Sequence, residues 1–152
     1  MMIDPPSDSF KRLPVLVCDD DADVRDFYKL VLVEFFEVTF ARDGLEAWRI
    51  LQEFKPRLIL TDLNMPGMNG LELTDKIKSN MRLRNTPVII ITGATRGSDL
   101  PPGFWRIGTQ ANAFLEKPIV PSELVAEMRK QILLNANITP LPPGRGSYGT
   151  EG

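Results

Sequence analysis

The 152-residue chain contains no histidine and a single cysteine, Cys18. Without histidine it lacks the commonest metal-binding side chain and the usual acid–base group near neutral pH. A single cysteine cannot form an internal disulfide. We therefore expect neither a histidine-dependent catalytic triad nor a zinc site. Cys18 lies in an apolar stretch, which favours a role as a small packed side chain over redox chemistry.

Long hydrophobic runs and an excess of positive charge are also absent. No apolar run approaches the roughly 20 residues that span a bilayer. Residues 1–10 carry Asp4, Pro5, Pro6 and Asp8 where a signal peptide would have a basic stretch and an apolar core. The 18 basic and 20 acidic residues give a net charge of -2, which does not suit binding to nucleic-acid phosphates. We predict a cytoplasmic protein that binds neither membranes nor nucleic acid.

The composition, 43% hydrophobic and 25% charged, fits one globular domain with tails. Residues 1–12 are polar and contain proline, so we expect a flexible leader. Residues 135–152 are rich in proline and glycine without apolar periodicity, which predicts a disordered tail. The folded domain is therefore expected over residues 13–134.

Within this domain, short apolar runs alternate five times with segments of helical periodicity. Strands are expected at residues 13–18, 36–41, 57–62, 86–92 and 111–115. Helices are expected at residues 23–36, 45–54, 71–78, 102–110 and 122–134, with Asp21 or Asp23 as the first N-cap and Ser122 as the last. The alternation predicts a doubly wound α/β fold, in which helices cover both faces of a five-stranded parallel sheet.

Acidic residues follow two of these strands. Asp19 and Asp20 end the first strand and Asp62 ends the third, and the carboxyl ends of neighbouring parallel strands meet at one edge of a sheet. Two like charges about 4 Å apart repel by roughly 4 kcal/mol at an effective dielectric near 20, so such a cluster needs a proton or a cation. Ligands that are all oxygen favour Mg²⁺, with Mn²⁺ as an alternative. Alone, the acidic run after the first strand would indicate only a helix N-cap, and Arg25 only a surface charge.

Two further strand ends carry groups suited to a phosphate. Thr92 supplies a hydroxyl after the fourth strand, and Lys117 supplies an ammonium after the fifth. With a metal ion on one side and Lys117 on the other, a carboxylate oxygen of Asp62 would face a phosphorus atom, and the charge of the transition state would be neutralised. The predicted product is an aspartyl phosphate.

Four ordered motifs end four different strands: Val15 to Asp20 (VLVCDD), Thr61 to Gly70 (TDLNMPGMNG), Ile91 to Gly93 (ITG) and Phe114 to Pro118 (FLEKP). Together they resemble the receiver domains of two-component response regulators, the CheY-like family, over about residues 13–134. The resemblance implies the flavodoxin-like strand order 2-1-3-4-5. This order is taken from the family, because the motifs alone do not specify it.

The resemblance also implies roles for individual residues. Asp62 would accept a phosphoryl group from the phosphohistidine of a histidine kinase or a histidine phosphotransfer protein. Mg²⁺ would be bound by Asp19, Asp20, Asp62 and the backbone carbonyl of Asn64. Thr92 and Lys117 would bind the phosphoryl group, Thr92 and Phe114 would act as the switch, and the Lys117–Pro118 peptide bond would be cis.

The chain departs from the family pattern at three places. Gly93 follows the switch threonine where a small residue such as alanine is common. Phe114 lacks the hydroxyl of the tyrosine often found at the switch position. The proline-rich segment from Ser98 to Gly103 replaces the start of a normal fourth helix, which belongs to the surface that contacts partners in this family.

The leading hypothesis is a single-domain response regulator that is not a turnover enzyme and signals to an unidentified protein target, as a monomer or an oligomer. One alternative is a scaffold of the same fold that is never phosphorylated. Another is a phosphohydrolase with an aspartate nucleophile, but such enzymes of the haloacid-dehalogenase type place a second aspartate two residues later. Asn64 stands there and cannot serve as a general acid. A flavin-binding protein is disfavoured because no glycine-, serine- and threonine-rich phosphate loop follows the first strand.

Overall fold

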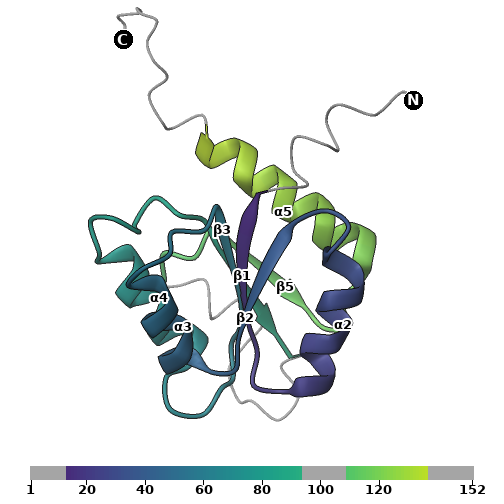
Figure 1. Ribbon diagram of the computed structural model, residues 1–152, viewed down its shortest axis with the longest axis horizontal. Coiled ribbons are helices and arrows are strands. Elements are labelled where there is room, and N and C mark those ends of the chain that lie inside the picture. The colour runs from purple at the N-terminus through teal and green to yellow at the C-terminus, as the bar shows by residue number, and fades with distance from the viewer. Residues whose placement is uncertain (1–12, 94–108, 137–152) are drawn as a thin grey trace, which may run out of the picture.

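A parallel sheet of five strands forms the centre of the computed structural model, which describes residues 13–93 and 109–136 (Figure 1). The strand order is β2-β1-β3-β4-β5, and every neighbouring pair is parallel. The predicted fold class and strand order are confirmed. The strands are β1 (Pro14–Cys18), β2 (Glu37–Ala41), β3 (Leu58–Asp62), β4 (Val88–Thr92) and β5 (Ala113–Glu116).

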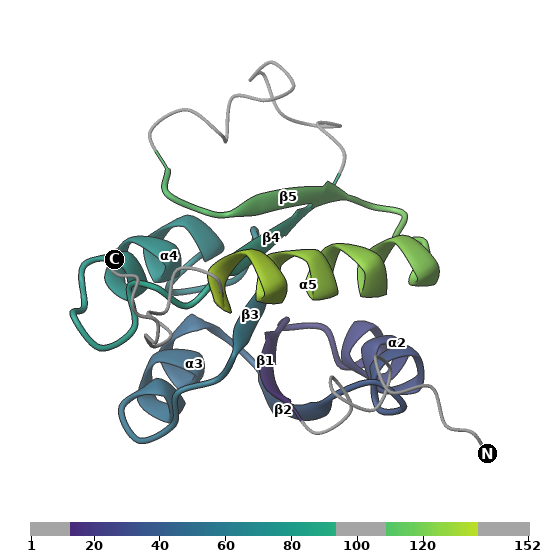
Figure 2. The ribbon, with the colours of Figure 1, turned by 90° about the horizontal axis from the view of Figure 1, so that it is seen from above.

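Helices cover both faces of the sheet. Seen from above, α3 and α4 lie on one side of the strands and α2 and α5 on the other (Figure 2). Each face buries its own apolar cluster, and the alternating side chains of the strands contribute to both clusters. Among the residues described, no helix has the length and apolar character needed to cross a bilayer. The described helices are α2 (Ala22–Leu32), α3 (Gly44–Leu51), α4 (Gly70–Lys78) and α5 (Pro121–Ala136).

The central strands β3 and β4 are buried at every position, which explains why they consist of continuous aliphatic residues instead of an alternating pattern. Their register fixes the edge at which they end. Cys18 of β1 is paired with Thr61 of β3, so the next residue of each strand, Asp19 and Asp62, comes at the same level. Likewise Thr92 of β4 is paired with Glu116 of β5.

Several predicted boundaries differ from the structure. Helix α2 ends at Leu32 and not at Phe36, because the amides of Phe35 and Phe36 both donate to the Leu32 carbonyl and close a turn there. Helix α5 begins at Pro121, a residue whose fixed φ suits the first helical position. Ser122 therefore lies in the first turn and is not the N-cap.

The ends of the predicted domain are tested only in part. Helix α5 continues to Ala136, so the first two residues of the predicted tail, Asn135 and Ala136, are helical. The leader at residues 1–12, the rest of the tail and residues 94–108 lie outside the described residues. Most of the predicted helix at 102–110 falls in that last segment, and its final two residues are not helical.

Lys78 joins three segments at the edge of the sheet opposite the acidic strand ends. Its ammonium donates to the carbonyls of Arg84 and Thr86 at 3.2 and 2.8 Å, and to the side-chain oxygen of Asn112 at 2.9 Å. The same Asn112 oxygen accepts from the amide of Val88 at 2.8 Å. One side chain from α4 thus links the loop before β4 to the residues before β5.

We expect Lys78→Met to lower the free energy of unfolding by about 1–3 kcal/mol, because three oxygens, of which the Thr86 carbonyl is part-buried, lose a charged donor. Urea denaturation measures this difference. Lys130→Met is the matched control, since Lys130 is exposed on α5 and loses the same charge. Equal stability losses in the two variants would contradict a structural role for the three hydrogen bonds.

Candidate functional site

The carboxylates of Asp19, Asp20 and Asp62 form a cluster at the carboxyl ends of β1 and β3. One oxygen from each lies within 4.8 Å of the others. Asp19 and Asp62 are 1% and 6% exposed, whereas Asp20 is exposed. The parallel arrangement of the strands predicts that these carboxylates lie close together, and the structure brings all three together.

Asp19 is held in a fixed orientation by its neighbours. Its amide donates to the carbonyl of Ala41 in β2 at 3.1 Å, and its Oδ1 accepts from the amide of Asp21 at 2.9 Å. Its other oxygen, Oδ2, is buried and has no hydrogen-bond partner among the described residues. A buried carboxylate oxygen without a donor is costly, so this atom is well suited to a bound cation.

Lys117 approaches the cluster from the end of β5. Its ammonium lies 3.3 Å from Oδ1 of Asp62, and its amide donates to the carbonyl of Thr92 at 2.9 Å. The Lys117–Pro118 peptide bond is cis. Thr92 is 3% exposed at the end of β4. The four strand ends that carry the predicted site residues therefore meet at one edge of the sheet.

The electrostatics of the cluster show an excess of negative charge. Burial raises the pKa of Asp19 to about 6, with a further contribution from the charge of Asp62. Burial also raises the pKa of Asp62, although the ammonium of Lys117 opposes this shift. One lysine does not balance three carboxylates. Because the available donors are all oxygens and one buried oxygen is unpartnered, the residues fit a hard divalent cation such as Mg²⁺.

The loop from β3 to α4 depends on close backbone approaches. Gly67 has a φ of +76°, which few residues other than glycine adopt. Gly70 begins α4 directly against the carbonyl of Asp62, and a Cβ there would collide with that oxygen. Asn69 caps α4 in a reciprocal pair with Glu72. These contacts fix the chain that follows Asp62 and the start of α4 against it.

A shallow hollow of about 370 Å³ lies beside this loop. Asn64 and Asn69 line it with polar groups, and Met65 and Pro66 line it with apolar surface. Asn64 is exposed. It follows Asp62 by two residues.

Two other candidates lie next to the site. The half-buried Phe114 of β5 packs against the core cluster on the side of α3 and α4. The Cys18 thiol lies 3.3 Å from the sulfur of Met65, and burial raises its pKa to about 12. A thiol with that pKa stays protonated at neutral pH, as a packing role requires.

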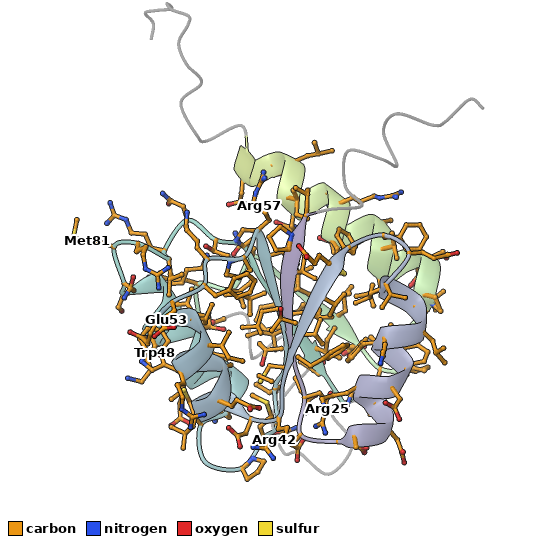
Figure 3. The ribbon with its side chains drawn as sticks, viewed as in Figure 1. Arg25, Arg42, Trp48, Glu53, Arg57 and Met81 are labelled. Atoms are coloured by element: carbon orange, nitrogen blue, oxygen red, sulfur yellow. The ribbon has the colours of Figure 1, made fainter. Side chains whose placement is uncertain are left out.

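Arg25 is the site neighbour that the sequence pattern missed. The sequence indicates a surface charge, but the side chain is half-buried and its Nη1 donates to the backbone carbonyl of Asp19 at 2.8 Å. Figure 3 shows Arg25 near the edge of the sheet where Arg42 also lies. No pattern in the sequence signals this contact, because a hydrogen bond from a side chain to a backbone carbonyl six residues earlier follows no helical or strand periodicity.

Comparisons with known proteins agree with this geometry. Residues 15–129 match the family described as the response regulator receiver domain. The chain is 32% identical over 125 residues to the DNA-binding response regulator MtrA of Mycolicibacterium paratuberculosis, which covers 82% of this chain and 53% of that protein. It is 32% identical over 119 residues to the response regulator Rre1 of Synechocystis sp., which covers 77% of this chain and 50% of that protein.

A solved structure is similar over its whole length. The signal receiver domain of a signal transduction histidine kinase from Syntrophus aciditrophicus superposes with a TM-score of 0.72 at 27% identity, covering 86% of this chain and 97% of that chain. The chain thus spans about half the length of the two relatives above and nearly all of this domain.

We expect Gly70→Ala to destabilise the protein by about 1–3 kcal/mol, because the added methyl must displace the carbonyl of Asp62 or the start of α4. Gly93→Ala is the matched control, since a Cβ at Gly93 meets no atom within 4 Å in the part of the chain that the structure describes. Urea denaturation compares the two variants. A Gly70→Ala protein as stable as Gly93→Ala would show that the close approach does not constrain Asp62.

Proposed function

Because the chain belongs to the response regulator receiver domain family, we propose that it is a signalling phospho-acceptor whose Asp62 carries the phosphoryl group. The observation that carries this proposal is the contact of Lys117 with Asp62 at 3.3 Å, inside a cluster of three carboxylates. Asp62 is the acidic residue of the cluster that is both buried and paired with a cation. It is therefore held in place as a nucleophile and is partly shielded from water.

Each residue of the site has a distinct part in the proposed transfer. A carboxylate oxygen of Asp62 attacks the phosphorus atom of a phosphohistidine, the phosphorus–nitrogen bond breaks, and the imidazole leaves with the electron pair and takes up a proton. Lys117 neutralises the phosphoryl oxygens, and the hydroxyl of Thr92 donates a hydrogen bond to them. Asp19, Asp20 and the Asn64 carbonyl complete the oxygen donors for Mg²⁺ or Mn²⁺. When bound, that ion supplies positive charge to the transferring group.

The proposed partners follow from this chemistry. A histidine kinase or a histidine phosphotransfer protein in the cytoplasm supplies the phosphoryl group, and a protein target responds to it. MtrA is a DNA-binding response regulator. For the present chain, a net charge of -2 favours a protein contact over a nucleic-acid contact as the output.

Turnover as a phosphohydrolase is not part of the proposal. The residue two positions after Asp62 is Asn64, whose amide cannot donate and recover a proton near neutral pH. A phosphorylated Asp62 would therefore persist as a signal for longer than an enzyme intermediate does. A scaffold that is never phosphorylated is the remaining alternative, and the next experiment distinguishes it.

We expect incubation with acetyl phosphate and Mg²⁺ to add one phosphoryl group, detected as a mass gain in the intact protein. Asp62→Asn should show no gain, and removing Mg²⁺ with a chelator should abolish the gain in the wild type. Asp26→Asn is the control for loss of an exposed carboxylate, because Asp26 lies on the surface of α2. A wild type without any gain would favour the scaffold, and an equal gain in Asp62→Asn would place the acceptor elsewhere.

We expect beryllofluoride with Mg²⁺, a mimic of the phosphoryl group, to shift the NMR signals of Thr92 and Phe114 in addition to those of the carboxylates. The added charge attracts the Thr92 hydroxyl, and the space it leaves allows the Phe114 ring to repack. Asp62→Asn under the same conditions is the control. Shifts restricted to the acidic residues would mean that the site binds the mimic without switching.

A further inference from the structure

We propose that Arg25 is a positioning residue for the cation site and acts through the backbone of Asp19. This inference rests on the proposed function only in requiring that the carboxylate cluster bind Mg²⁺. Arg25 does not touch the reacting atoms. Its Nη1 donates to the Asp19 carbonyl at 2.8 Å and so joins the second turn of α2 to the end of β1.

The surrounding hydrogen bonds make this link stiff. Asp21 caps α2 by accepting from the amides of Asp23 and Val24, and its carbonyl accepts from the amide of Arg25 at 3.0 Å. These bonds fix the backbone of Arg25 relative to the turn between β1 and α2, to which its side chain is also hydrogen-bonded. The turn between β1 and α2 is closed twice, once by the helix cap and once by the guanidinium.

The orientation of Asp19 depends on this turn. Its amide is bound by Ala41, its carbonyl by Arg25 and its Oδ1 by the amide of Asp21, which leaves the buried Oδ2 as the atom available to a cation. If the carbonyl loses its donor, the peptide between Asp19 and Asp20 loses one of its restraints. The cation ligands on both residues would then be less well ordered.

Lys117 and Arg25 act in different ways at this edge. Lys117 pairs with a carboxylate oxygen of Asp62, whereas Arg25 forms no ion pair with a carboxylate among the described residues. Arg25 therefore orders the ligands without occupying a ligand atom. Its planar guanidinium makes a directional hydrogen bond that a flexible ammonium reproduces only in part.

The test compares Arg25→Met, Arg25→Lys and Arg57→Met. Arg57 is the matched control, because it is exposed and lies at the opposite edge of the sheet from Arg25, so its replacement removes the same charge far from the cluster (Figure 3). Calorimetric titration of each protein with Mg²⁺ gives the dissociation constant. Partners that orient metal ligands typically contribute 10–100-fold to affinity, and we expect about a 10-fold weaker constant for Arg25→Met, partial rescue in Arg25→Lys and no change in Arg57→Met.

Two further measurements separate positioning from a general structural effect. In the metal-free protein, the amide of Asp21 should exchange its hydrogen faster in Arg25→Met, while amides of β3 and β4 exchange as in the wild type. In phosphorylation with acetyl phosphate, the variant should need more Mg²⁺ for half-maximal rate but approach the wild-type rate at saturation.

Each outcome has a defined meaning. Equal Mg²⁺ affinity in Arg25→Met and the wild type would overturn the inference. An equal loss of Mg²⁺ affinity in Arg25→Met and Arg57→Met would also overturn it, because the loss would then depend only on net charge. A wild type that binds no Mg²⁺ would also overturn it. A wild type that binds Mg²⁺ but takes up no phosphoryl group would contradict the proposed function alone, since the affinities would still test Arg25.

Discussion

The carboxylates of Asp19, Asp20 and Asp62 repel one another, and the rest of the structure must hold them together against this repulsion. At about 4 Å and an effective dielectric near 20, two buried carboxylates such as Asp19 and Asp62 repel by roughly 4 kcal/mol, while a whole domain is stable by only about 5–15 kcal/mol. Their oxygens lie within 4.8 Å of one another, and the ammonium of Lys117 meets one of them. A bound cation would relieve this repulsion, which makes the cluster suited to a divalent ion.

The rest of the molecule has to keep these charges from moving apart. The buried aliphatic strands β3 and β4 do so because a register shift would move an entire core face toward solvent. Gly70 adds a second restraint, since its lack of a side chain lets α4 begin against the carbonyl of Asp62. The helix cap at Asp21 adds a third at the end of β1. Rigid elements thus surround a site whose charges alone would drive it open.

The fold class and the meeting of the strand ends could be predicted from the sequence because both depend on patterns along the chain. Aliphatic runs mark buried parallel strands, and polar residues at their carboxyl ends must share an edge. The strand order could be predicted only from the family resemblance, since no sequence pattern specifies which strands are neighbours. The side-chain links of Arg25 and Lys78 could not be predicted, because a bond from a side chain to a distant carbonyl leaves no periodic trace. The early end of α2 at Leu32 was missed for a similar reason, since apolar residues continue through the turn that closes it.

The same electrostatics couple the cation to the proposed modification of Asp62. A phosphate group brings roughly 1.5 to 2 negative charges near pH 7, so phosphoryl transfer increases the charge that the cation must balance. A cation beside Asp62 should therefore bind more tightly after transfer than before it, and by linkage its presence must favour the phosphorylated state by the same factor. Lys117 contributes to that balance directly through its contact with Asp62. Arg25 would contribute by keeping the ligands on Asp19 and Asp20 in place. In this reading one basic residue, Lys117, neutralises charge at the site, and a different one, Arg25, orders the ligands.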